Sequence, residues 1–317
     1  MARGPVTRDP ADSPLPVASR SFGTPKLRTR IDPAGDGYLW HRTRMYASTG
    51  APPDGVGGVW HAAARRSGNT FTYLLPDASS AADLIVPGAG RAAQEHAHAC
   101  AALAGVGRAL REHAEARPPA GTAPAPLGAV QIVRWITAPA DTAAGEGLRA
   151  GLSAAVGTQR MERLHAWADA LTRTSRSAIS LHGELSLAAV IPRRGGIPAV
   201  LYGETISRGP LEYDAGWLLG ELAELNDLSA LGGNRDDGEH LGCHARSFAH
   251  PIASLLDPEI LGRCVVLRRL MHIIDYARFF GTGPLARYID DMPELIDSSG
   301  MNTLARMSID SLPAFRR

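Results

Sequence analysis

Four polar side chains in the middle of the chain have the types and spacing to do chemistry. His182 and Glu184 follow an apolar run at residues 178–181 that is typical of a strand. A carboxylate at the end of a strand can orient or accept the proton of a substrate hydroxyl. Glu204 and Asp214 come later in the same stretch, and carboxylate oxygens are ligands that Mg²⁺ prefers. The stretch therefore carries the residue types of a site for proton transfer or metal binding.

A strand, a hairpin and a helix are predicted to position these residues. Apolar runs at residues 187–192 and 198–202 flank an Arg-Arg-Gly-Gly segment at residues 193–196, which predicts a β-hairpin. Apolar residues then recur at helical spacing from Leu211 to Leu225. Asp214 therefore falls at the beginning of a helix.

The order of these features over roughly residues 178–228 resembles the catalytic segment of aminoglycoside-phosphotransferase-like kinases. That family reads H-G-D-x-x-x-x-N, a hairpin, I-D-[WF], and then G-D-P-x-x-D-L-A, and this chain has His-Gly-Glu at residues 182–184, the hairpin, and Gly-Pro at residues 209–210 ahead of Asp214. The resemblance implies an α+β, bilobal, protein-kinase-like fold with a reduced β-rich N-lobe and a larger helical C-lobe. It also implies ATP and Mg²⁺ as the partners of a phosphoryl transfer to a hydroxyl group.

Several positions depart from the family pattern. Glu184 stands where the family has its catalytic Asp, so the carboxyl group remains but lies one methylene further from the backbone. Ala189 replaces the metal-binding Asn, and Tyr202 replaces the metal-binding Asp. Glu204 has the same strand parity as Tyr202 and is the remaining candidate for a magnesium ligand.

The resemblance implies supporting roles for two further residues. Asp214 corresponds to a structural acid that binds unpaired backbone N–H groups at a helix N-terminus. His182 is expected to brace the catalytic loop, with proton transfer as the alternative role.

The family's phosphate-binding lysine has no counterpart in the expected N-lobe. Lys26 is the only lysine of the chain, and it falls within residues 1–33, a proline-rich segment that we predict to be disordered. The arginines Arg42, Arg44 and Arg65 remain as candidate cations for the ATP phosphates, because a guanidinium can hold phosphate bidentately. With at most one conventional metal ligand, weak ATP binding that depends little on magnesium is expected.

The sequence after the hairpin resembles a narrower group of proteins within this family. Residues 203–225, supported by residues 103–111 and 133–136, look like the divergent phosphotransferase-like proteins of class V lanthipeptide and thioamide-peptide biosynthesis. This implies phosphorylation of Ser or Thr in a precursor peptide, followed by phosphate elimination by a lyase-like protein partner. The alternative is a pseudokinase that binds and presents the precursor peptide without transferring phosphate, which the loss of the family's Asn, Asp and Lys favours.

The remaining sequence predicts the domain organisation. A disordered arm is predicted at residues 1–33. The strand-like patterns at residues 37–90 predict the small N-lobe. Residues 91–317 predict the helical C-lobe, which contains the hairpin at residues 178–202. Within the C-lobe, residues 130–135 read as a short strand.

Composition excludes several classes of protein. The 317 residues are 44% apolar, enough for a sizeable core, and the net charge of +1 gives no overall basic field for nucleic acid or an anionic membrane. The three cysteines form no C-x-x-C pair, and no apolar stretch is long enough to span a membrane. We therefore expect a soluble cytoplasmic protein.

Two further patterns carry weaker signals. Glu239, His240, Cys243 and His244 offer nitrogen and sulfur donors in a predicted loop, but they lack the paired spacing of a structural zinc site. The Gly-Asp-Gly at residues 35–37 could approach phosphate through its backbone, but it does not match a glycine-rich phosphate loop.

Overall fold

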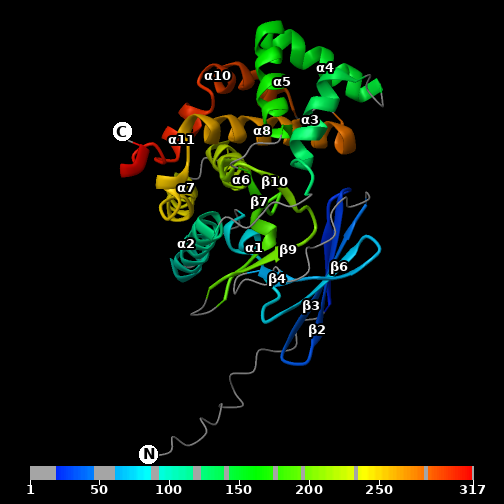
Figure 1. The fold of residues 1–317 in the computed structure, drawn as a ribbon, viewed down its shortest axis with the longest axis vertical. Coiled ribbons are helices and arrows are strands. Elements are labelled where there is room, and N and C mark those ends of the chain that lie inside the picture. The colour runs from blue at the N-terminus through cyan, green and yellow to red at the C-terminus, as the bar shows by residue number, and fades with distance from the viewer. Residues whose placement is uncertain are drawn as a thin grey trace, which may run out of the picture.

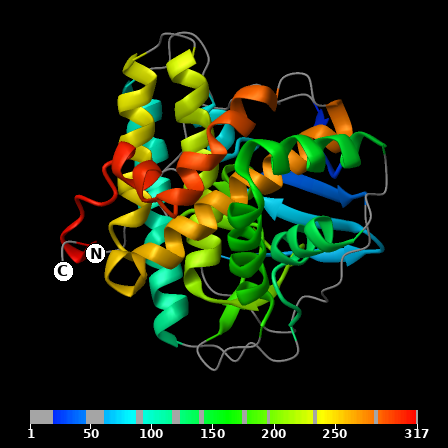
Figure 2. The ribbon, with the colours of Figure 1, turned by 90° about the horizontal axis from the view of Figure 1, so that it is seen from above.

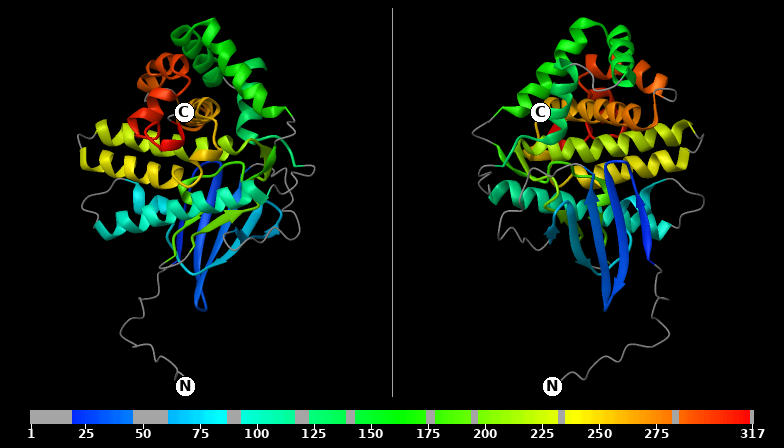
Figure 3. Two further views of the ribbon diagram at one scale, coloured as in Figure 1. Left: turned by 60° about the vertical axis from the view of Figure 1, so that its left-hand side comes forward. Right: turned by 90° about the vertical axis from the view of Figure 1, so that its right-hand side faces the viewer.

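The protein folds into a small β-rich N-lobe beneath a larger helical C-lobe (Figure 1; Figure 3). The computed structural model describes residues 19–45, 61–86, 93–116, 123–138, 143–173, 178–193, 197–231, 235–281 and 285–315. This arrangement confirms the α+β, bilobal fold expected from the sequence.

The N-lobe is built on an antiparallel sheet of five strands in the order β1-β2-β3-β6-β5. Its strands are β1 (Arg20–Gly23), β2 (Leu27–Ala34), β3 (Gly37–Arg44), β5 (Arg65–Ser67) and β6 (Thr70–Leu75). In β3 the register pairs Arg42 with Phe71 of β6, and it pairs Arg44 with Leu27 of β2. Because side chains alternate along a strand, Arg42 and Arg44 share one face of the sheet and His41 lies on the other.

One face of this sheet is buried against the hairpin that follows the catalytic-loop segment. The hairpin strands are β8 (Val190–Ile191) and β9 (Ala199–Tyr202), which pair antiparallel, and β4 (His61–Ala63) adds to β9 in parallel. The shared core contains Ile31, Trp40, Phe71, Tyr73, Leu75, Ala78, Ala189, Ile191, Ala199 and Leu201. Apolar packing therefore fixes the N-lobe strands relative to the hairpin.

The prediction that residues 1–33 form a disordered arm is wrong for residues 20–33. Strands β1 and β2 begin within residues 1–33 and complete the N-lobe sheet, whereas residues 1–18 lie outside the described part of the chain. In β2 the buried Thr29 and Ile31 alternate with exposed Arg28 and Arg30. This period of two is a strand signal that the proline-rich composition obscured.

Helices make up most of the C-lobe. The described helices are α1 (Ala81–Ile85), α2 (Ala93–Ala116), α3 (Leu127–Thr137), α4 (Ala143–Val156), α5 (Thr158–Thr172), α6 (Leu211–Leu231), α7 (Arg235–Ala249), α8 (Pro258–Phe280), α9 (Ala286–Asp290), α10 (Met292–Asp297) and α11 (Met301–Arg306). Local chemistry sets their limits: α8 begins where the Asp257 side chain accepts the N–H groups of Glu259 and Ile260, with Pro258 at the first position. It ends at Gly281, whose φ of 84° lies in the left-handed region.

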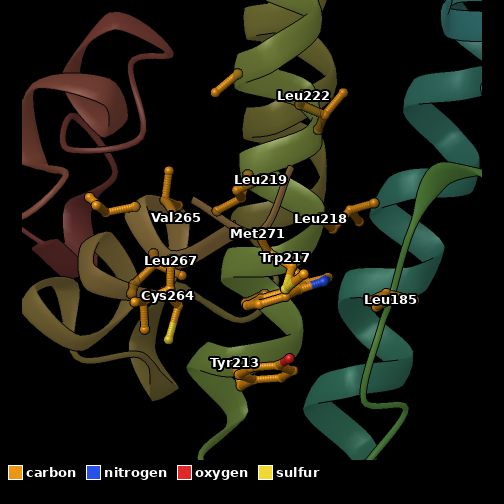
Figure 4. Packing of buried hydrophobic residues seen from close by; sticks show 14 of the residues in the cluster. Leu185, Tyr213, Trp217, Leu218, Leu219, Leu222, Cys264, Val265, Leu267 and Met271 are labelled. Carbon is orange, nitrogen blue, oxygen red and sulfur yellow. The ribbon is translucent and has the colours of Figure 1, made fainter. Parts of the chain in front are cut away.

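The pair α6 and α8 forms the centre of the C-lobe core (Figure 4). Gly216 permits the close approach, because a Cβ at this position would lie 2.4 Å from the Cβ of Cys264. On α6 the rings of Tyr213 and Trp217 stack with centroids 4.3 Å apart. Seen from above, α2 and α7 run side by side at one edge of this core (Figure 2).

Two local predictions in the C-lobe are wrong. Residues 130–135 form part of helix α3 instead of a strand, because Gly128, Ala129 and Ile132 face the core and packing against α5 and α8 overrides the β-propensity of the valines. Cys243 and its neighbouring histidines lie in helix α7 instead of a loop. Among the described residues, no helix is long and apolar enough to cross a membrane.

Candidate active site

A short loop after β7 (Ile179–Leu181) carries the first two site residues. Strand β7 pairs antiparallel with β10 (Ser207–Gly209), which brings this loop against residues 203–205. Gly183 makes the close approach possible: its φ is +91°, and a Cβ there would lie 1.9 Å from the carbonyl oxygen of Thr205. The Thr205 hydroxyl in turn donates to the carbonyl of His182 at 3.0 Å.

Asp214 holds the loop from the first turn of α6. Its carboxylate accepts the backbone N–H of His182 at 2.7 Å and that of Gly183 at 2.9 Å. Burial raises the pKa of Asp214 to about 6, against the opposing effect of these hydrogen bonds. The N–H groups that Asp214 binds therefore belong to the loop that it supports.

His182 braces the loop from the other side. Its Nε2 donates to the carbonyl of Leu201 in β9 at 2.7 Å, and its Nδ1 accepts the backbone N–H of Glu184 at 3.4 Å. Burial lowers the pKa of His182 to about 4. The ring is therefore neutral near pH 7 and has both nitrogens engaged with the backbone, which suits a bracing role better than proton transfer.

The Glu184 carboxylate lies at the junction of the two lobes. Arg44 of β3 donates to its Oε2 at 2.9 Å, and this carboxylate side chain is 24% exposed. Burial alone would raise the pKa of Glu184, but the charges of Arg44 and then Lys26 outweigh burial and lower it. Glu184 is therefore an ionised carboxylate that is flanked by cations.

Glu204 and Arg42 form a buried ion pair. Arg42 Nε lies 2.8 Å from Glu204 Oε1, and the Tyr73 hydroxyl donates to the same oxygen at 2.9 Å. Arg42 also donates to the carbonyl of Ala188 at 3.1 Å. The candidate metal ligand and one candidate phosphate cation are thus bonded to each other.

The other two positions of the family's metal site provide no ligand. Ala189 is buried in the N-lobe core, and the Tyr202 hydroxyl lies 3.0 Å from Ser180 Oγ. With Glu204 paired to Arg42, these residues do not fit Mg²⁺ bound in the manner of the family. No group of three or more His, Cys, Asp or Glu side chains suited to a metal ion occurs among the described residues.

Arg65 does not belong to the site. It lies exposed on the edge strand β5, where its register partner is Thr72 and the partner of Thr72 on β3 is His41. Since His41 and Arg42 point to opposite faces, Arg65 is on the face away from Arg42 and Arg44. The proposed role of Arg65 at phosphate is therefore wrong.

Lys26 is a site residue that sequence analysis missed. It lies in the turn between β1 and β2 and forms an ion pair with Asp275 of α8. The available signals were the alternation that marks β2 and the presence of a single lysine.

The Gly-Asp-Gly at residues 35–37 is not close to these residues. It is at the opposite end of β3 from Arg44, about 23 Å away at the rise of a strand, so it cannot bind the same phosphates.

A small hollow lies beside these charges. Its volume is about 260 Å³ when the space open to solvent is counted. It is lined by Arg44, Pro124, Ala125, Leu127, Glu204, Thr205, Ile206 and Ser207. Arg44 lines this hollow and also pairs with Glu184.

A second cluster of polar side chains lies outside the site, between α2 and α7. The rings of His96 and His240 stack with centroids 3.7 Å apart, and the Sγ atoms of Cys100 and Cys243 lie 3.4 Å apart. Stacked rings do not direct their nitrogens to a common point, in keeping with the lack of a metal-binding group here.

Comparisons with known proteins identify no family for this chain. No family model matches the sequence, and no curated protein matches it. Solved structures of small-molecule kinases are similar: a spectinomycin phosphotransferase in complex with ADP and spectinomycin (10% identity, 90% of this chain and 92% of that chain, TM-score 0.48) and an amicoumacin kinase in complex with AMP-PNP and Ca²⁺ (10% identity, 87% and 88%, TM-score 0.49). A glucosamine kinase in complex with glucosamine, ADP and inorganic phosphate is also similar (16% identity, 90% and 75%, TM-score 0.46).

The chain's own helices and strands define a two-lobed α+β fold. Similarity at this level does not show what a protein does, so the chemistry of the site depends on this chain's own residues.

Proposed function

We propose that this protein is an ATP-dependent phosphotransferase that acts on hydroxyl groups. The observation that carries the proposal is the ionised Glu184, held by a braced loop at the lobe junction with Arg44 2.9 Å away. In phosphoryl transfer, a carboxylate positions the acceptor hydroxyl while cations stabilise the charge on the transferred group. Glu184 and the cations beside it supply both parts.

The residues suggest how the transfer would proceed. The acceptor oxygen bonds to the γ-phosphorus of ATP as the bond from that phosphorus to the bridging oxygen breaks, which leaves ADP. Glu184 orients the acceptor hydroxyl and receives its proton late in the step, since its lowered pKa makes it a weak base. Arg44 can turn from Glu184 to the γ-phosphate oxygens, because a guanidinium offers several donors.

The substrate we propose is a Ser or Thr hydroxyl of a precursor peptide, and a lyase-like protein partner would then eliminate the phosphate. This finer assignment is supported only by the sequence resemblance of residues 203–225 to the phosphotransferase-like proteins of peptide tailoring.

A pseudokinase that presents the peptide without transferring phosphate is the second candidate. The ion pair between Arg42 and Glu204 favours it, because the pair neutralises the carboxylate best placed to hold a metal. The two candidates differ in one observable, the covalent transfer of phosphate.

The test is intact-mass analysis of a Ser- and Thr-containing candidate precursor peptide after incubation with the protein and ATP. Wild-type protein should produce phosphopeptide, Glu184→Gln should lower the rate by about 100-fold or more, and Glu115→Gln should have no effect. Glu115 is a matched control because it also pairs with an arginine, Arg111, but on the exposed surface of α2. Unmodified peptide with the wild-type protein, with and without the partner, would reject transfer, and tight peptide binding in that case would support presentation.

A further inference from the structure

The turn between β1 and β2 holds Lys26 at the end of the N-lobe sheet that faces the C-lobe helices (Figure 3). The backbone N–H of Met45 donates to the Lys26 carbonyl at 2.9 Å, and the register pairs Leu27 with Arg44. The turn is thus fastened to the end of β3 from which Arg44 reaches Glu184.

The Lys26 side chain crosses from the N-lobe to the C-lobe. Its ammonium group pairs with the Asp275 carboxylate of α8, and the two side chains are 20% and 27% exposed. The same ammonium lowers the pKa of Glu184, second only to Arg44 among the neighbouring charges. Lys26 therefore lies close to both Asp275 and Glu184, with part of its surface open to solvent.

The cations around the site differ in how firmly they are held. Arg42 is almost fully buried, forms an ion pair with Glu204 and donates to the Ala188 carbonyl, so it cannot turn to a ligand without breaking a buried pair. Lys26 instead has a flexible stem and one carboxylate partner across the lobe junction. Lys26 is therefore the cation that can change partner at the lower cost.

We propose that Lys26 exchanges Asp275 for the terminal phosphates of ATP beside Glu184, and so takes the place of the lysine that a kinase-like site has on its third strand. This inference rests on the proposed function. A triphosphate carries several negative charges and attracts an ammonium more strongly than one carboxylate does. Asp275 is not left without a cation, since the Arg268 guanidinium lies close enough to lower its pKa.

The single lysine makes a direct test possible. After labelling with an amine-reactive reagent and cleavage with trypsin, the labelled lysine is read in the peptide of residues 21–28, because trypsin no longer cuts at a modified Lys26. ATP and inorganic tripolyphosphate should slow the labelling by roughly tenfold, the effect of one charge-assisted contact. Adenosine should not slow it. Equal labelling with and without ATP and tripolyphosphate would overturn the proposal.

Binding measurements on variants give a second readout. Lys26→Met should weaken ATP and tripolyphosphate binding by roughly tenfold in titration calorimetry. The matched control Arg28→Met, which changes an exposed cation on the adjacent strand β2, should not. Asp275→Asn should tighten binding of both ligands, because it removes the competitor for Lys26. If the ion pair served only to hold the two lobes together, Asp275→Asn would fail to tighten binding. That result would overturn the proposal that Lys26 exchanges Asp275 for phosphate.

The outcomes separate this inference from the proposed function. Lys26-dependent binding of tripolyphosphate without phosphopeptide formation would retain the phosphate contact and reject the transferase. Full kcat and unchanged KM for ATP in a folded Lys26→Met protein would retain the transferase and reject the contact. Absence of binding of both ATP and tripolyphosphate by wild-type protein would reject both.

Discussion

Arg42 Nε lies 2.8 Å from Glu204 Oε1, and the two side chains are only 6% and 4% exposed. The pair joins β3 of the N-lobe to the segment after β9, and the Tyr73 hydroxyl completes it by donating to the same carboxylate oxygen. An ion pair buried to this degree stays closed because separating it would leave two charges without solvent. It is therefore part of the scaffold of the site.

Breaking this pair should be costly. Arg42→Met leaves the Glu204 carboxylate buried without a cation and should lower the free energy of unfolding by about 3–5 kcal/mol, measured by urea denaturation. The double variant Arg42→Met/Glu204→Gln should recover much of that loss, because the amide removes the charge and still accepts from Tyr73.

The control for this prediction is Arg30→Met. Its pair with Asp32 leaves the Arg30 side chain 65% accessible, so the loss should stay below about 1 kcal/mol. Equal losses for Arg42→Met and Arg30→Met would show that burial does not strengthen the Arg42 pair.

Gly183→Ala should displace the loop that carries Glu184. The added Cβ would lie 1.9 Å from the Thr205 carbonyl at a φ of +91°, so the expected loss of unfolding free energy exceeds about 2 kcal/mol. Gly68→Ala is the control, since its φ is +59° but no atom lies within 4 Å of the new Cβ. Its loss should be about 1 kcal/mol, from backbone strain alone. Similar losses in thermal unfolding would contradict the close approach at Gly183.

His182 should make the fold sensitive to acid. Its pKa in the folded protein is about 4, below its unfolded value, because it is buried. Between these values the unfolded chain binds the proton more tightly, so stability is present above about pH 6.5 and is lost as the pH falls toward 4, by up to roughly 3 kcal/mol. Asp214, with a raised pKa of about 6, has the opposite slope in the same range.

The His182 contribution can be isolated by difference. The stability gap between wild type and His182→Gln should narrow as the pH falls from 7 to 4. An NMR titration should find the His182 ring neutral at pH 5.5. A ring protonated at that pH would contradict the assignment.

Magnesium should have little effect on nucleotide binding. Ala189 and Tyr202 supply no ligand and Glu204 is bonded to Arg42, so replacing Mg²⁺ with EDTA should change the Kd for ATP by less than about threefold. Glu204→Gln should leave that small change unaltered. A tenfold gain in affinity with Mg²⁺ that disappears in Glu204→Gln would show that the ion pair opens to hold the metal.

The sequence by itself determined the central segment. The strand before His182, the hairpin, and the helix that begins near Asp214 are each specified by residues within a few positions of one another, and periodicity reports such local preferences. The supporting roles of His182 and Asp214 and the loss of ligands at Ala189 and Tyr202 were expected from the resemblance of this segment to a known family's catalytic segment.

Only the tertiary structure decided which charges meet. Arg42 and Glu204, Arg44 and Glu184, and Lys26 and Asp275 are far apart in the sequence and come together because the N-lobe sheet packs against the hairpin and reaches α8. Packing of α3 against α5 and α8 made residues 130–135 helical. An ion pair depends on distance and burial, which the whole fold sets, so neither the partner of Glu204 nor the place of Lys26 could be read from local pattern.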